Sequence, residues 1–118
     1  MYYPGRSSGL GLALSKKFLE QGAFVFGVSR TKQHWKTALT AVSHSNRFFL
    51  RAVDLIEEFV VKQLIRSVKK KAGRIDFLIN CAGYGGRLAT VEQLGLSEFR
   101  KHLSHNLLSA FLMCKHTI

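Results

Sequence analysis

Gly5-Arg6-Ser7-Ser8-Gly9-Leu10-Gly11, followed directly by apolar residues at helical spacing, is the stretch that decides the fold. Glycine lacks a Cβ atom, so a loop with this glycine spacing lets its backbone N–H groups approach a ligand closely. The helix that follows adds unpaired N–H donors and a partial positive charge at its first turn. The pattern is typical of a loop that binds a pyrophosphate. A glycine-rich turn that only begins a helix is the alternative.

The residues after this loop alternate between helical and strand-like patterns. Apolar residues spaced three and four apart indicate helices, and short runs rich in Val, Phe and Ile indicate buried strands. Gly22 and Gly73 stand where helices end, whereas Asp54 and Ser97 stand where they can cap the helices that follow them. The pattern predicts helices over 10–21, 31–43 and 55–72, strands over 23–28, 47–53 and 75–79, and a final helix after Ser97.

This alternation predicts an α/β fold, a doubly wound parallel sheet with helices on both faces. In such open sheets the ligand binds at the carboxyl ends of the strands. Three distinctive groups of residues fall at that edge: the glycine loop, Ser29-Arg30, and Asn80-Cys81-Ala82-Gly83. Their coincidence predicts a ligand site there.

Composition narrows the class of protein. The chain has 118 residues, so we expect one domain over 1–118. It has no long apolar run, so we expect no membrane span. Its net charge is +11. Two cysteines are too few for a disulfide scaffold, which favours a reducing, cytoplasmic setting. The histidines lack metal-ligand spacing, and we expect no metal site.

The positive charge has three readings: nucleic acid, an acidic membrane surface, or an anionic ligand. Its densest part alternates with apolar residues, as on an amphipathic helix with a solvated basic face. That interpretation is favoured over a nucleic-acid partner, because no nucleic-acid motif accompanies the cluster. The cluster comprises Lys62, Arg66, Lys69, Lys70, Lys71 and Arg74.

Taken in order, the motifs resemble those of the short-chain dehydrogenase/reductase family, which has a Rossmann fold and uses nicotinamide cofactors. The glycine loop resembles that family's TGxxxGxG motif, and Asn80-Cys81-Ala82-Gly83 resembles its NNAG motif. Asp54 matches the acidic residue that contacts adenine. Asn106 falls where the family places the helix Asn of its catalytic tetrad. The spacing agrees over nearly the whole chain.

The chain departs from the family at several points. Pro4 replaces the Thr before the first glycine, Cys81 replaces the second Asn of NNAG, and the first strand is reduced to residues 1–4. No Tyr in these residues is followed by Lys four positions later, so the proton-donating pair of the family is absent. We therefore predict a truncated Rossmann domain, the cofactor-binding half of a reductase, inactive alone. The alternative is a non-catalytic remnant that binds NADP or oligomerises.

The resemblance implies a role for each motif residue. Arg30 would pair with the 2′-phosphate of NADP, whereas an acidic residue at this position would favour NAD. Arg6, Ser7 and Ser29 could contact the same phosphate. The alternative is that Arg30 and Arg6 are ordinary surface charges. Asp54 would bind adenine, cap its helix, or do both. The predicted cofactor-binding residues are Gly5, Arg6, Ser7, Ser8, Gly9, Leu10, Gly11, Ser29, Arg30, Asp54, Leu55, Asn80, Ala82 and Gly83.

Asn106 is the one predicted catalytic residue. The resemblance gives it a place in a proton relay, and the alternative is a buried Asn that ties its helix to a neighbouring backbone carbonyl. The substrate would be a small carbonyl or alcohol. The final helix carries a wide apolar arc, which predicts cover by the sheet and by another helix or subunit, so a homo-oligomer is possible through this helix. The arc includes Leu96, Phe99, Leu103, Ala110 and Met113.

Overall fold

The computed structural model describes residues 9–31, 40 and 46–118. Residues Gly5 to Ser8, the reduced first strand, and nearly all of the helix predicted over 31–43 lie outside the described residues. The described elements follow in this order: α1 (Leu10–Glu20), β1 (Val25–Ser29), β2 (Phe48–Ala52), α3 (Glu58–Ala72), η1 (Val91–Gln93), α4 (Leu96–His102), η2 (Leu103–Leu108) and α5 (Ser109–Thr117).

The two strands pair in parallel, which confirms the predicted direction of the sheet. Their register runs from Val25 opposite Phe48 to Ser29 opposite Ala52. Gly27 in the middle of β1 lies close to β2, because a Cβ atom there would lie 2.8 Å from a terminal methyl of Leu50, which would have to shift. The bulky side chains of Phe48 and Leu50 on β2 thus occupy the space that a side chain at position 27 would need.

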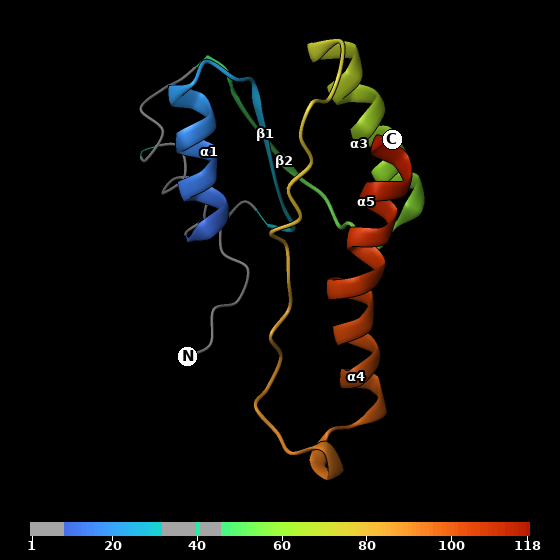
Figure 1. Cartoon of the computed structure of the whole chain (residues 1–118). Helices are drawn as coiled ribbons and strands as arrows, with labels where there is room; N and C mark the ends of the chain where they lie inside the picture. The colour runs from blue at the N-terminus through green and yellow to red at the C-terminus, as the bar shows by residue number, and fades with distance from the viewer. Residues whose placement is uncertain (1–8, 32–39, 41–45) are drawn as a thin grey trace.

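Helices lie on both sides of this strand pair (Figure 1). Helix α1 covers one side, and α3 and α5 lie together on the other. Residues 74–95 form a long connection that first passes between these layers and then continues beyond the strands to the start of α4 (Figure 1). Within it, Phe77 packs on Phe18 of α1, with ring centroids 5.4 Å apart, whereas Leu78 packs against the core beneath α3. The arrangement is that of an α/β layered fold.

The core lies between α3, α5 and the sheet. The buried face of α3 repeats at helical spacing and meets Leu112 and Met113 of α5. Phe26 and Val28 of β1 pack against this cluster. The buried residues of α3 are Val61, Leu64, Ile65 and Val68.

The strand predicted over 75–79 is wrong, because these residues form no strand in the described structure. A strand exists only with a hydrogen-bonded neighbour. In the strand order 3-2-1-4 of doubly wound folds, the strand before the glycine loop lies between the second and fourth strands. That place falls on residues 1–4, and no described residue takes it, so 75–79 lie between the helical layers as an extended but unpaired segment.

Two predicted caps are also wrong. The helix predicted from Leu55 begins at Glu58, and the backbone N–H of Ile56 donates to Asp54 Oδ1 over 3.3 Å, so Asp54 closes a local turn three residues before the helix. The final helix begins at Leu96 with Gly95 before it, and Ser97 lies inside its first turn. The predicted ends at Gly22 and Gly73 are confirmed, since both adopt positive φ angles, of 85° and 82°.

The described chain is elongated. Its principal extents are 48 × 29 × 20 Å and its radius of gyration is 15.2 Å, against about 13 Å for a compact domain of this length. The continuous helical column of α4, η2 and α5 extends well beyond the strands (Figure 1). Among the described residues, the connection that precedes this column is what covers its lower part (Figure 1).

Candidate functional site

The elements that carry the predicted site residues converge at the carboxyl edge of the strand pair. Strand β1 ends at Ser29 and β2 at Ala52, and α1 begins at the same end (Figure 1). The connection after α3 passes this edge on its way to α4 (Figure 1). The glycine turn, the end of β1 and the Asn80–Gly83 loop are thus brought together, as the sequence predicts.

Gly9 and Gly11 form the start of α1. Gly9 has φ 125° and ψ −147°, a conformation that is essentially restricted to glycine, and its carbonyl accepts the first helical hydrogen bond from Ala13 over 2.9 Å. A Cβ atom on Gly11 would lie 3.5 Å from the Cβ of Cys81, so the helix start packs against the Asn80–Gly83 loop. Leu10 is 71% exposed.

The first turn of α1 retains its capacity for an anion. It contains no acidic residue, and no side chain caps it. The helix dipole therefore presents a positive end at the carboxyl edge, beside the Asn80–Gly83 loop. A negatively charged group would be stabilised at this position.

Ser29 and Arg30 follow β1. The Ser29 hydroxyl donates to the Thr31 carbonyl over 2.7 Å, which fixes the turn that leaves the strand. The guanidinium carbon of Arg30, an exposed residue, lies 6.0 Å from the centre of the Tyr84 ring. This is cation–π distance and connects the end of β1 to the loop after Gly83.

Asp54 and Leu55 lie after β2 and are both half-buried. The Asp54 carboxylate is used locally by Ile56, and the Leu55 side chain packs against the core. Asn80 is exposed, and its side-chain amide lies 3.5 Å from the sulfur of Cys114 on α5. The loop after it is therefore held to both α1 and α5.

Asn106 anchors the loop that follows Gly83. The backbone N–H of Tyr84 donates to Asn106 Oδ1 over 2.6 Å, and the Asn106 amide donates to the Tyr84 carbonyl over 2.9 Å. Gly83 accommodates this approach, because a Cβ atom on it would lie 3.3 Å from Asn106 Oδ1. The predicted tie to a neighbouring backbone is found, although Asn106 is exposed and not buried as that alternative assumed.

The helix is wider where Asn106 lies. Residues Leu103–Leu108 form a π-helix, η2, in which backbone N–H groups bond five residues back. Side chains fill positions beside the altered ladder: His105 Nδ1 lies 2.9 Å from the Lys101 carbonyl, and the Ser109 hydroxyl donates to the His105 carbonyl over 2.7 Å. π-Turns of this kind are frequent at functional sites.

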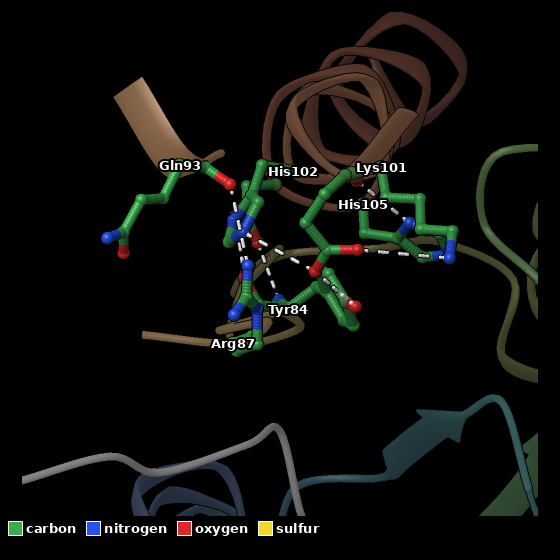
Figure 2. Close-up of polar contacts among 8 residues, drawn as sticks. Tyr84, Arg87, Gln93, Lys101, His102 and His105 are labelled. Atoms are coloured by element: carbon green, nitrogen blue, oxygen red, sulfur yellow. Dashed lines mark hydrogen bonds and ion pairs between the residues drawn. The ribbon is translucent and has the colours of Figure 1, made fainter. Parts of the chain in front are cut away.

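Tyr84 is the residue that sequence reasoning missed. Figure 2 shows its side chain among those of α4 and η2, where its hydroxyl donates to Glu98 Oε1 over 2.7 Å. Its ring centre lies 5.1 Å from that of His102 and 5.5 Å from that of His105. The Tyr84 hydroxyl bond lowers the pKa of Glu98, with smaller help from Lys101. The sequence signal was the helical spacing of Glu98, His102 and Asn106.

Gly86 closes this cluster. It has φ 60°, and a Cβ atom there would collide with His102 and with Glu98 Oε1. Farther along, the Arg87 guanidinium donates to the Gln93 carbonyl over 3.4 Å (Figure 2).

Within the described ranges, no group of three or more His, Cys, Asp or Glu side chains could hold a metal ion. None of the described helices combines the length and apolar character needed to cross a bilayer.

Comparisons with known proteins identify the family of this chain. The family model described as short chain dehydrogenase matches residues 1–118. Oxidoreductase BOA17 of Botryotinia fuckeliana is 33% identical over 114 residues, which are 97% of this chain and 41% of that protein. A crystal structure of a short-chain dehydrogenase/reductase from Burkholderia xenovorans has a TM-score of 0.85 at 28% identity, over 98% of this chain and 45% of that one.

A second solved structure, ElxO with NADP bound, has a TM-score of 0.77 at 25% identity, over 89% of this chain and 42% of that one. The chain therefore spans less than half the length of the relatives that it matches. It belongs to the short-chain dehydrogenase family. Its strand pair and flanking helices are part of an NAD(P)-binding Rossmann fold, and its relatives are oxidoreductases.

Proposed function

We propose that this chain is the cofactor-binding part of an NADP-dependent oxidoreductase that interconverts a small carbonyl and the corresponding alcohol. The observation that carries the proposal is the packing of Gly11 against Cys81, at 3.5 Å between Cβ positions. It sets the positive end of α1 beside the Asn80–Gly83 loop, at the edge where open α/β sheets bind their ligands. Family membership supports the same conclusion.

The residues present fit a dinucleotide. Gly9 and Gly11 leave the helix start free of side-chain bulk, and the first turn of α1 has no acidic residue to repel a pyrophosphate. Gly5, Arg6, Ser7 and Ser8 would complete the loop. Asn80, Ala82 and Gly83 would border the ribose next to the nicotinamide, and Asp54 and Leu55 the adenine. When bound, the cofactor supplies the hydride.

The preference for NADP over NAD rests on Arg30. An arginine at the end of the second Rossmann strand can bind a 2′-phosphate through charge-assisted hydrogen bonds. Arg30 is exposed and faces the Tyr84 ring, a weak contact that a phosphate could replace. The net charge of +11 favours a phosphorylated cofactor as well.

Asn106 has two roles in this proposal. It holds Tyr84 through two backbone hydrogen bonds, and so fixes the loop that borders the cofactor. In a longer protein it would also serve the proton relay of the family. These 118 residues contain no Tyr-x-x-x-Lys pair, so the chain alone is not expected to turn over substrate, and robust reductase activity of the purified chain would refute that part of the proposal.

The test is a titration of the purified chain with NADPH and NADH, followed by nucleotide fluorescence at fixed salt. We expect saturable binding with NADPH preferred. Arg30→Ala should weaken NADPH roughly tenfold or more, the loss of a hydrogen bond to a charged group, and leave NADH unchanged. Arg100→Ala, which removes an exposed cation of α4, is the control. Equal losses for both variants, or for both nucleotides, would contradict the role of Arg30.

We also propose that the column of α4, η2 and α5 forms a contact between copies of the protein. Leu103, Leu107 and Phe111 are 44%, 65% and 56% exposed, and with Ser104 and Leu108 they line an open apolar hollow. Leu107→Glu should shift the sedimentation coefficient to that of a monomer; no shift would contradict the contact.

The two free thiols, Cys81 and Cys114, support a reducing, cytoplasmic location.

A further inference from the structure

A strongly basic surface lies on α3, away from the carboxyl edge of the sheet. Wound at 3.6 residues per turn, its members occupy an arc of about 100° and a length of about 16 Å. All are exposed, and α3 lies at the side of the molecule opposite α1 (Figure 1). We call this surface the basic face; it consists of Phe59, Lys62, Arg66, Lys69 and Lys70.

The one carboxylate beside this face is already bound. Glu58 Oε1 lies 3.0 Å from Lys115 Nζ, 2.8 Å from His116 Nε2 and 3.9 Å from Lys62 Nζ. Lys115, from α5, therefore lies beside the start of α3 and neutralises this carboxylate. Among the described residues, no ion pair engages Arg66, Lys69 or Lys70, so the basic face carries a net positive charge.

An exposed aromatic side chain lies in the same arc. Phe59 is 72% exposed, although it precedes the buried Val61 by only two residues. Its position three and seven residues before Lys62 and Arg66 aligns it with these cations along the helix. Phe59 contributes nothing to the core cluster, which is formed by the opposite face of α3.

We propose that the basic face docks on an anionic phospholipid bilayer, with the lysines and arginine at the headgroups and Phe59 in the interface. Clusters of four or more cations on an amphipathic helix are attracted to anionic lipid, and aromatic side chains on such a helix enter the boundary between headgroups and acyl chains. A single-stranded nucleic acid instead requires a groove with several stacking aromatics. The basic face of α3 offers one aromatic side chain, Phe59, in the first turn of the helix. The proposal goes beyond the cofactor site and does not depend on it.

The test is co-sedimentation of the 118-residue chain with vesicles of phosphatidylcholine, with and without a quarter of phosphatidylserine. The chain should bind the mixed vesicles and not the neutral ones, and added salt should release it. Lys62→Gln with Arg66→Gln should weaken partitioning roughly thirtyfold, from about 1 kcal/mol per cation at an anionic surface. Phe59→Ser should weaken it while the salt dependence is retained.

The control is Lys16→Gln with Arg100→Gln, which changes the net charge equally on α1 and α4 and should bind like the parent chain. Gln has nearly the helix propensity of Lys and Arg, and far-ultraviolet circular dichroism checks that both variants fold. If the control variant lost as much vesicle binding, the total net charge and not the basic face would explain the effect, and the proposal would be overturned. Equal binding to neutral vesicles, or tight binding to a short RNA without binding to phosphatidylserine, would overturn it as well.

Discussion

Gly9 and Gly95 stand at equivalent places, each directly before a helix, yet their backbones differ. Gly9 has φ 125°, whereas Gly95 has φ −65°, and neither would place a Cβ atom within 4 Å of a neighbour. Space is thus equal at the two sites and only the conformation differs. The glycine before α1 is needed for its backbone, and the glycine before α4 is not.

Gly9→Ala should therefore lower the free energy of unfolding by about 1–3 kcal/mol, the cost of a side chain in a glycine-only conformation. Gly95→Ala should lower it by less, about 0.5–1 kcal/mol, because Ala is a poorer residue than Gly before a helix but meets no backbone strain at this φ. Urea denaturation followed by circular dichroism measures both. Equal effects of the two substitutions would show that the positive φ of Gly9 carries no cost.

Single side chains also show what the sequence could predict about the site. The family resemblance singles out Asn106 as a candidate catalytic residue, and its place on an apolar stripe suggests a tie to a neighbouring backbone; the structure shows hydrogen bonds to the backbone of Tyr84. Tyr84 itself was not predicted, because its partners Glu98 and His102 lie on a helix fourteen and eighteen residues later. Contacts of this range depend on the course of the intervening connection, which no local pattern encodes.

Between elements, the contact of α3 with α5 has two parts. The buried apolar faces meet in the core, and Glu58 at the start of α3 binds Lys115 and His116 near the end of α5. These hydrogen bonds, with Lys115 as the larger cause, lower the pKa of Glu58 from 4.5 to about 2. The folded state therefore favours the charged carboxylate relative to the unfolded chain.

The sign of the pH dependence follows from this shift. A lowered pKa contributes stability that is complete above the unfolded value of 4.5 and is lost as the pH falls toward 2. Glu58→Gln should flatten the fall in thermal unfolding midpoint over that range, measured by circular dichroism. Glu57→Gln, the exposed neighbour, is the matched control. A control variant that flattens the curve as much would contradict a specific role for Glu58.

The described helices and the two paired strands agree with the apolar periodicity, because each of these elements packs against another described element. The helix predicted over 31–43 stays a prediction. Residues 75–79 carry the same apolar signal, but no described residue forms a strand beside them. The prediction failed because the described structure offers no hydrogen-bonded neighbour, and not because the residues lack strand propensity. The caps at Asp54 and Ser97 failed for a local reason. Both side chains can hydrogen-bond the backbone either in a turn or at the start of a helix. The packing of the surrounding chain decides which of the two forms.

At the scale of the whole chain, the local free energy of opening should differ between segments. Helix α3 is buried against α5, whereas 75–79 and the loop after it are largely exposed. Amide hydrogen exchange read by mass spectrometry should show slow exchange in peptides of α3 and of β1 with β2, and fast exchange in 75–79. Slow exchange of 75–79 would mean that this segment is paired as a strand in solution and would contradict the described arrangement.

The absence of a partner strand for 75–79 among the described residues has a practical consequence. Strand β1 pairs with β2 on one side, and among the described residues no strand occupies its other side. Rows of unused N–H and C=O groups are templates for an extended segment from a second molecule. A concentrated sample is thus expected to cross-associate through its own sheet edges, and a peptide of strand-like sequence supplied in excess should compete with that process. Protein concentration becomes an experimental variable on a par with salt and pH.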